Sequence, residues 1–302
     1  MAAAAACLRA PAPARLVPVM VSRFEEELRF GLHAFAQRSP QGGVAAKAPT
    51  KAPTKAAKDP PDTMRVLCLH GYLQNGDVFK QKTGSLRRVL KGCEFTFLDA
   101  PHEAEPFPDA TGEDAEASAS AEGGVLRGWW SSGENQCRKD GQVFVDELSK
   151  GTMEWVRPAQ SFSYFGFEEG VTYARAAAAE ALGSQGSFDG VLAFSQGCAV
   201  TTALLREAQS MEGHPLASVR FVILVGGFVP KDPAVAAKLR GDGDTRLSLQ
   251  SLHVSGVNDV SVPRLRSEAL AELYEPSQVA GFDHPGRHGL PNGTGAFKQE
   301  LQ

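Results

Sequence analysis

The chain has 302 residues, of which 42% are hydrophobic and 22% are charged, and its formal net charge is −4. This composition is typical of a globular protein and offers no basic surface for a nucleic acid. No stretch approaches the roughly 20 consecutive apolar residues of a membrane-spanning helix. The five cysteines are scattered, without the short spacings of zinc sites. We therefore expect free thiols, no metal and a cytoplasmic protein, with the nucleus as an additional location.

Residues 1–63 differ in composition from the rest of the chain. They are rich in alanine, proline and lysine, and residues 47–58 form the short repeat KAPTKAPTKAAK. Such a segment cannot bury enough apolar surface to offset the entropy lost on ordering. We predict a low-complexity extension with one amphipathic helix over 22–36, followed by a single domain over 64–302. Residues 1–24 hold three arginines and no acidic residue, so organellar targeting is an alternative.

From Met64 onward, apolar runs alternate with segments that favour helices. Runs that are apolar throughout are typical of parallel strands buried on both faces. Their alternation with helices predicts an α/β fold, a mostly parallel, doubly wound sheet with helices on both faces. The acidic segment 103–124 has no periodicity and is predicted to be a disordered surface loop. We expect strands in 66–69, 93–102, 190–194, 218–228, 251–259 and 277–284, and helices in 165–182, 198–211, 264–274 and 293–302.

In a sheet of this kind, ligands bind at the carboxyl ends of the strands. The segments that follow the predicted strands are therefore candidate site loops. They are His70-Gly71-Tyr72, Pro101-His102, Ser195-Gln196, Gly226-Gly227 and Asp259.

Ser195 lies in the sequence LAFSQGCAV, between a predicted core strand and a predicted core helix. A serine on such a strand–turn–helix joint is typical of the nucleophile elbow, G-x-S-x-G. Ala193 replaces the first glycine of the motif, and alanine is the next smallest residue, so the steric argument still holds. The alternative interpretation is an ordinary turn in which the Ser195 hydroxyl caps the helix.

A serine nucleophile needs a histidine base and an acid that orients the histidine, in the chain order serine, acid, histidine. Among the downstream histidines, His214 precedes a proline in an expected surface turn, and His253 lies in an expected strand. His288 precedes a glycine after the last strand, where the base is expected. His284 is the alternative base.

Asp259 is the preferred acid, because it ends the loop after a strand and thus lies at a carboxyl end. Asp242 and Asp244 precede that strand and are expected on the other side of the sheet. Asp283 is the second choice. The alternative role of Asp259 is an N-cap within its loop.

An acyl-transfer intermediate needs two backbone N–H donors for its oxyanion. We predict the amide of Gln196, directly after the nucleophile, and the amide of Tyr72, in the loop after the first strand. His70 either braces this loop or is an ordinary core histidine, and both interpretations stay open. Trp129 and Trp130 are expected in the core rather than in a substrate wall.

With these residues located, the sequence resembles the FSH-type serine hydrolases, a family of α/β-hydrolases. The resemblance spans about residues 64–292. It implies an α/β-hydrolase fold and a carboxylic-ester hydrolase with Ser195, Asp259 and His288 as its triad. The family usually has glycine where Ala193 stands. The segments that carry the resemblance are RVLCLHGYLQNGDVF, LDAPH, RGWW, YFGFEEGVTY, DGVLAFSQGCAV, HVSGVNDVSVP and GRHGLP.

The leading hypothesis is a metal-independent serine esterase without a cofactor, which cleaves a small-molecule ester through an acyl-enzyme. The alternatives are a thioesterase that uses the same site and a hydrolase fold kept as a non-catalytic binding module. A nucleotide-dependent oxidoreductase is disfavoured, because no G-x-G-x-x-G follows a strand. Neither the natural substrate nor the oligomeric state is predicted.

Overall fold

The computed structural model describes residues 63–90, 92–104, 124–131, 164–184, 186–243 and 245–291. Three of the predicted segments lie outside this part of the chain. They are the helix expected over 22–36, nearly all of the acidic loop 103–124, and the helix expected over 293–302.

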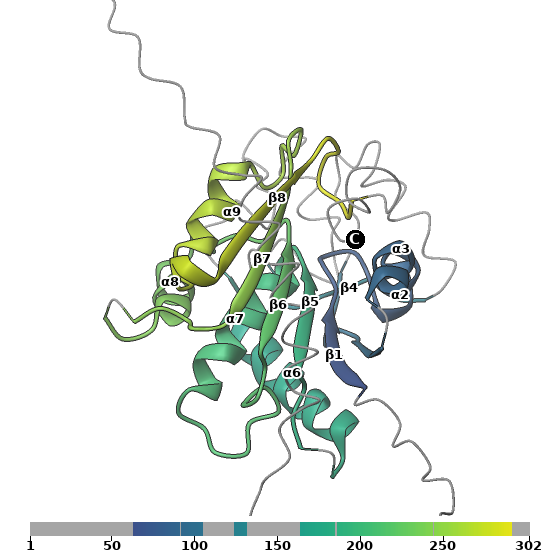
Figure 1. Cartoon of the computed structure of the whole chain (residues 1–302), viewed down its shortest axis with the longest axis vertical. Helices are drawn as coiled ribbons and strands as arrows, with labels where there is room; N and C mark the ends of the chain where they lie inside the picture. The colour runs from purple at the N-terminus through teal and green to yellow at the C-terminus, as the bar shows by residue number, and fades with distance from the viewer. Residues whose placement is uncertain are drawn as a thin grey trace, which may run out of the picture. The chain divides into compact units, whose positions relative to one another are not determined.

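Six parallel strands form the central sheet, in the order β2-β1-β5-β6-β7-β8 (Figure 1). The chain moves outward from β1 to β2, then returns to the other side of β1 and continues from β5 to β8. The sheet therefore has a topological switch point between β1 and β5, where the crevice at the carboxyl ends is expected to bind ligands. The strands are β1 (Met64–Leu69), β2 (Cys93–Leu98), β5 (Gly190–Phe194), β6 (Phe221–Val225), β7 (Gln250–Gly256) and β8 (Val279–His284).

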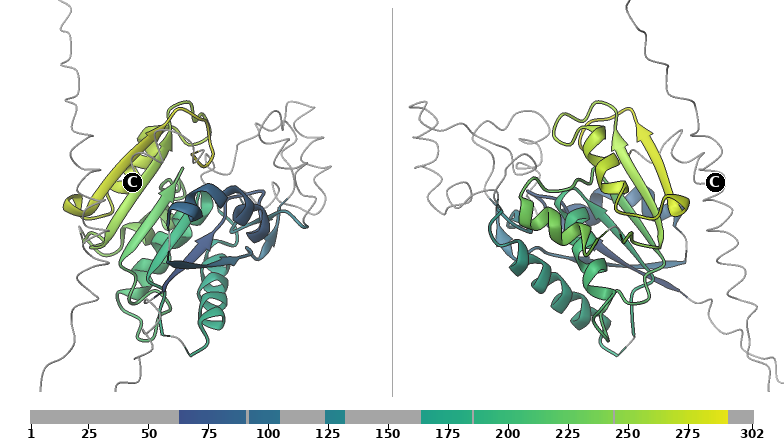
Figure 2. Two further views of the ribbon diagram at one scale, coloured as in Figure 1. Left: turned by 45° about the vertical axis from the view of Figure 1, so that its right-hand side comes forward. Right: turned by 90° about the vertical axis from the view of Figure 1, so that its left-hand side faces the viewer.

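Helices cover both faces of the sheet, as Figure 2 shows. On one face, α2 packs against β1 and β2, and α3 packs against α2. On the other, α7 packs between α6 and α8, and α9 approaches α7 where Leu270 and Cys198 meet at Gly227. The α/β fold with helices on both faces is thereby confirmed. The helices are α2 (Gly76–Lys82), α3 (Gly84–Val89), α6 (Phe167–Leu182), α7 (Gln196–Ala208), α8 (Pro233–Arg240), α9 (Arg264–Ala271) and the 3-10 helix η2 (Pro276–Gln278).

A two-stranded antiparallel ribbon, β3 (His102–Glu103) with β4 (Arg127–Gly128), lies outside the main sheet. This ribbon could not be predicted from the sequence, because each strand has only two residues. The N–H of Arg127 also donates to the Gln74 carbonyl over 2.9 Å. The ribbon is thus joined to the loop that follows β1.

The main core lies between the sheet and the layer of α6, α7, α8 and α9. Trp129 and Trp130 are both fully buried in it, as predicted. The prediction that His214 lies in a surface turn is wrong, since only 2% of this residue is exposed. It packs close to Glu207 of α7, and its Nδ1 accepts from the Leu216 N–H over 3.1 Å. Among the described residues, no helix is both long and apolar enough to cross a membrane.

Candidate active site

Ser195 occupies a sharp turn between β5 and α7. Its φ of 52° and ψ of −115° place a non-glycine residue in a strained backbone conformation, which is the conformation that the elbow motif predicts. Its own N–H donates to the Val225 carbonyl of β6 over 2.9 Å. Ala193 lies in β5, fully buried, and allows this turn. At Gly197, a Cβ atom would lie 2.8 Å from the His70 carbonyl oxygen, so only glycine fits.

The side chains of Ser195, His288 and Asp259 form one hydrogen-bonded chain. The distance from Ser195 Oγ to His288 Nε2 is 2.9 Å, and that from His288 Nδ1 to Asp259 Oδ2 is 2.6 Å. An ionised carboxylate only accepts hydrogen bonds, so Nδ1 of His288 is the donor toward Asp259. In the neutral ring Nε2 is then the acceptor, and it faces the serine hydroxyl. Ser195 follows β5, Asp259 follows β7 and His288 follows β8. The carboxyl ends of three strands therefore meet here.

Asp259 is held by its own loop. Its Oδ1 accepts from the Ser261 N–H over 2.9 Å and from the Val262 N–H over 2.7 Å, while Oδ2 faces His288. The Asp259 side chain is only 1% exposed, whereas that of His288 is 21% exposed. The N-cap-like contacts foreseen as an alternative role are thus present together with the contact to histidine. The buried carboxylate fixes one side of the imidazole, and solvent or a ligand reaches the other.

The alternative base and acid lie outside this chain of hydrogen bonds. Asp283 accepts from Ser255 Oγ over 2.7 Å and pairs with Arg264, also at 2.7 Å. His284 is buried, and its Nδ1 accepts from the Gly286 N–H over 3.2 Å. Burial lowers the pKa of His284. Both residues shape the end of β8 rather than contact Ser195.

The loop after β1 passes directly beside the nucleophile. A Cβ atom on Gly71 would lie 3.0 Å from Ser195 Cβ and closer still to the Phe194 ring, so a side chain has no room there. His70 Nδ1 donates to the Gly71 carbonyl over 2.7 Å, and its Nε2 accepts from the Ala100 N–H over 3.0 Å. Burial lowers the pKa of His70 to about 4, so the ring is neutral at pH 7. Of the two interpretations of His70, the structure favours the brace.

The two predicted oxyanion donors belong to segments that adjoin Ser195. Gln196 is the first residue of α7, and its N–H has no acceptor among the described residues. First-turn amides lack intrahelical partners and point along the helix axis, where the dipole favours negative charge. Tyr72 lies in the loop that Gly71 holds against Ser195.

Two contacts near the serine were not foreseen from the sequence. The Gln196 side chain bonds the main chain of Trp129 and Trp130, and the Trp129 indole donates to the His70 carbonyl. The partners are about 60 residues apart or more along the chain, so no local pattern signals them.

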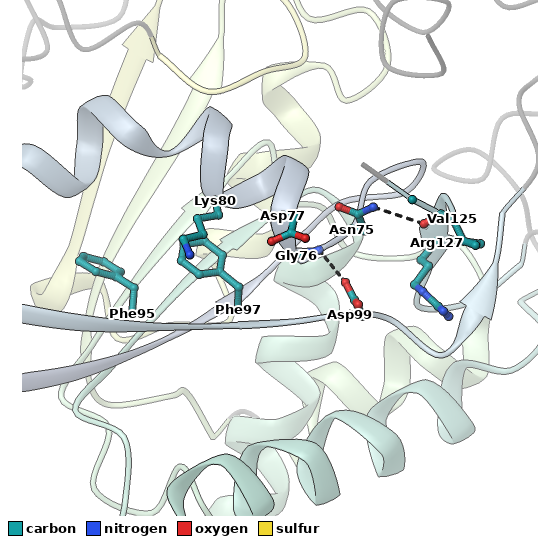
Figure 3. Close-up of a pocket in the computed structure, with 10 residues that line it drawn as sticks. Asn75, Gly76, Asp77, Lys80, Phe95, Phe97, Asp99, Val125 and Arg127 are labelled. Atoms are coloured by element: carbon teal, nitrogen blue, oxygen red, sulfur yellow. Dashed lines mark hydrogen bonds between the residues drawn. The ribbon is translucent and has the colours of Figure 1, made fainter. Parts of the chain in front are cut away.

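A pocket of about 390 Å³ opens beside the end of the loop that follows β1. It lies at the edge of the sheet that β2 forms (Figure 3). Phe95 and Phe97 form its apolar wall, with Lys80 beside them. At its other end the Gly76 N–H donates to Asp99 Oδ1 over 2.7 Å.

The described residues hold no group of three or more side chains placed to bind a metal ion.

A parallel sheet with a serine at a strand–helix elbow, followed along the chain by an acid and a histidine from later loops, is the arrangement of the α/β-hydrolases. The chain matches the model of the family described as "Serine hydrolase (FSH1)" over residues 60–299, and it belongs to that family. The family expected from the sequence motifs is thereby confirmed.

Several curated relatives carry the name esterase. The chain is 33% identical to "Esterase OVCA2" of Danio rerio over 231 residues, which cover 76% of this chain and 90% of the relative. It is also 33% identical to "Esterase OVCA2" of Homo sapiens over 230 residues, covering 76% and 89%. Identity to "Esterase CG5412" of Drosophila melanogaster is 33% over 233 residues, covering 76% and 69%.

Proposed function

We propose that the protein is a serine hydrolase that cleaves small-molecule carboxylic esters through an acyl-enzyme, with Ser195, His288 and Asp259 as its catalytic triad. The observation that carries the proposal is the continuous hydrogen-bonded chain from Ser195 Oγ through His288 to Asp259. A hydrolase fold used only to bind a ligand has no need of this geometry. Membership of a serine hydrolase family and the esterase names of the relatives agree with it.

In the first half of the reaction, Ser195 Oγ attacks the acyl carbon and its proton passes to His288 Nε2. The carbonyl oxygen becomes an oxyanion, stabilised by the N–H groups of Gln196 and Tyr72. When the bond to the leaving alcohol breaks, His288 gives that alcohol its proton, and the acyl group stays on Ser195.

In the second half, water attacks the acyl-enzyme and His288 takes the proton from water. Collapse of the second intermediate returns a proton to Ser195 Oγ and releases the carboxylic acid. Asp259 keeps Nδ1 protonated throughout and stabilises the positive charge of the imidazolium.

Because side chains supply both the nucleophile and the base, we expect a chelator to leave turnover unchanged. The described cysteines are unpaired, which supports a reducing, cytoplasmic compartment.

A fluorophosphonate probe and a short nitrophenyl ester test the proposal together. We expect the probe to label the wild-type protein, and Ser195→Ala to lose both labelling and turnover, the latter by a factor of roughly 10³ or more. Ser255→Ala is the matched control, because Ser255 bonds an aspartate outside the triad. Full turnover by Ser195→Ala would refute the mechanism, and a wild-type protein that is neither labelled nor active would favour a binding module.

The same assay with a matched thioester separates the two acyl-transfer activities. Attack on the acyl carbon is the same for both substrates, so the triad variants should lose both activities in parallel. The ratio of kcat/KM for the ester and the thioester then assigns the protein to one class or the other.

A further inference from the structure

The two proposed oxyanion donors come from loops that are distant in sequence, one after β1 and one after β5. The distance between the two N–H groups has to let both donate to the same oxygen atom. A misplacement of about 1 Å at an active site costs up to about 10²-fold in rate. The residues that hold the two loops at a fixed distance from each other therefore determine how well the two N–H groups stabilise the oxyanion.

Residues 127–130, the sequence RGWW, contact both loops at once. On the β1 side, the Trp129 Nε1–H donates to the His70 carbonyl over 2.7 Å. The Arg127 N–H donates to the Gln74 carbonyl over 2.9 Å. These two bonds hold the loop on either side of Tyr72. We call residues 127–130 the RGWW brace.

On the β5 side, the brace is bound by the side chain of Gln196. Gln196 Oε1 accepts from the Trp129 N–H over 2.9 Å, and Gln196 Nε2 donates to the Trp130 carbonyl over 3.1 Å. One amide side chain thus bonds the backbone of two successive residues of the brace. Only 1% of Gln196 is exposed, so water does not compete for these bonds.

The brace also fixes the ring of Tyr72. A Cβ atom on Gly128 would lie 2.6 Å from Tyr72 Cδ2 and 3.4 Å from Gln196 Oε1, so residues of both loops meet at this one glycine. Beyond the brace, Ser131 and Phe165 exchange two backbone hydrogen bonds of 2.9 Å, which tie it to the start of α6. The brace is therefore anchored independently of the two loops.

We propose that Trp129 and the side chain of Gln196 are positioning residues, which set the distance between the Tyr72 and Gln196 amides of the oxyanion hole through the RGWW brace. This inference rests on the proposed function, because it concerns the intermediate of that reaction. It predicts a loss of transition-state stabilisation without a loss of substrate binding.

Trp129→Phe tests the proposal, with Trp130→Phe as its matched control. Both tryptophans are fully buried and both changes remove the same volume. Trp129 Nε1 bonds the His70 carbonyl, whereas Trp130 Nε1 has no acceptor in the described part of the chain. We expect Trp129→Phe to lower kcat about 10- to 100-fold with little change in KM. Trp130→Phe keeps the backbone carbonyl that accepts from Gln196 and loses no side-chain hydrogen bond to the described residues, so it should lower kcat by a clearly smaller factor than Trp129→Phe.

The inhibition constant of an alkyl trifluoromethyl ketone measures oxyanion stabilisation directly. A change that affected only the stability of the fold would leave this constant unaltered. Ser195 Oγ adds to the ketone carbon, its proton passes to His288, and the former carbonyl oxygen becomes a hemiketal oxyanion in the hole. The inhibition constant should rise for Trp129→Phe by the same factor as kcat falls. Equal kcat and inhibition constants for Trp129→Phe and Trp130→Phe would overturn the proposal.

If Trp129→Phe does not fold, Gln196→Met decides the question. Methionine keeps the length of the side chain and the backbone N–H but removes both bonds to the brace. The same paired loss is expected, and wild-type values would overturn the proposal. Failure of the proposed function is distinguishable, because the wild-type protein itself would then show no turnover or inhibition that depends on Ser195.

Discussion

Asp259 divides its two carboxylate oxygens between its own loop and His288. Oδ1 accepts from the N–H groups of Ser261 and Val262, and Oδ2 accepts from His288. Two backbone N–H groups can only donate, so the atom facing them has to be an acceptor. This arrangement determines which way an asparagine at position 259 would turn.

In Asp259→Asn, the amide oxygen should stay on the two N–H groups and the NH2 group should face His288. His288 Nδ1 would then have to accept, which puts the proton on Nε2 and removes the base for Ser195. We expect kcat to fall by roughly 10²–10⁴ with little change in melting temperature, as for the serine-protease triad. Steady-state kinetics on a nitrophenyl ester and thermal melting check this.

Asp283→Asn is the control for this substitution. Asp283 contacts Ser255 and Arg264 rather than His288. Its kcat should remain near that of the wild-type protein. A larger loss from Asp283→Asn than from Asp259→Asn would contradict the assignment of the acid.

Single residues differ in how well the sequence foretells their surroundings. Chain order and the carboxyl-end rule lead to Ser195, Asp259 and His288, which the structure brings within hydrogen-bond distance, while their catalytic roles remain a prediction. The bonds of Gln196 and Trp129 could not be predicted, because they join segments far apart in the chain and follow no periodic pattern.

At the scale of one element, α8 begins with a helix cap that has two functions. Asp232 Oδ1 accepts from the N–H groups of Ala234 and Val235 over 2.9 and 3.3 Å. Oδ2 accepts from the Tyr164 N–H over 3.1 Å, just before α6. The cap therefore also holds the segment that leads into a neighbouring helix.

Asp232→Ala should lower the free energy of unfolding by about 1–2 kcal/mol, since it removes an N-cap and leaves the Tyr164 N–H without this acceptor. Urea denaturation followed by circular dichroism measures the change. Asp242→Ala, in the exposed loop after α8, serves as the reference and should change stability by less than about 0.5 kcal/mol. Equal stability of the two variants would show that the cap contributes nothing.

The elements that the sequence predicted share one property, a continuous apolar run or a long amphipathic segment. Buried strands such as β5 and the 16-residue helix α6 satisfy it. The helices α2 and α3 have seven and six residues, too few for helical periodicity to be visible. In α8, the start signal Asp232-Pro233 is present in the sequence and would have identified the helix.

At the scale of the whole molecule, buried neutral histidines make the folded state sensitive to acid. His253 packs against Tyr274, and its Nε2 has no partner in the described residues. Burial lowers its pKa from 6.5 to about 3. Below pH 6.5 the unfolded chain binds a proton that the folded chain does not, so stability falls as the pH falls.

His253→Phe should remove this contribution while keeping a ring of similar size against Tyr274. Between pH 7.5 and 4.5, its free energy of unfolding should fall by about 3 kcal/mol less than that of the wild-type protein. Urea denaturation at the two pH values provides the measurement. An identical pH dependence of the two proteins would show that His253 is protonated in the folded state.

A chain that begins at Thr63 should fold and hydrolyse esters as the full chain does. The segment before it has the composition of a low-complexity extension. The first residue of β1 is already tied to the domain, because the Met64 N–H donates to the Gly92 carbonyl over 3.0 Å. Thermal melting and kcat/KM of the two chains check this. Loss of folding would show that the helix expected over 22–36 is part of the core.

The hydrogen bonds at the two ends of the RGWW brace also determine where this protein can accept added sequence. The Ala104 N–H donates to the Leu126 carbonyl over 2.8 Å, and Ser131 pairs with Phe165, so each pair closes the base of one intervening stretch of chain. Doubling the length of a closed loop costs only about 0.6 kcal/mol in closure entropy. We therefore expect a flexible insertion between these closing bonds to cost the folded state little, because the bonds that position the brace beside Ser195 lie outside it.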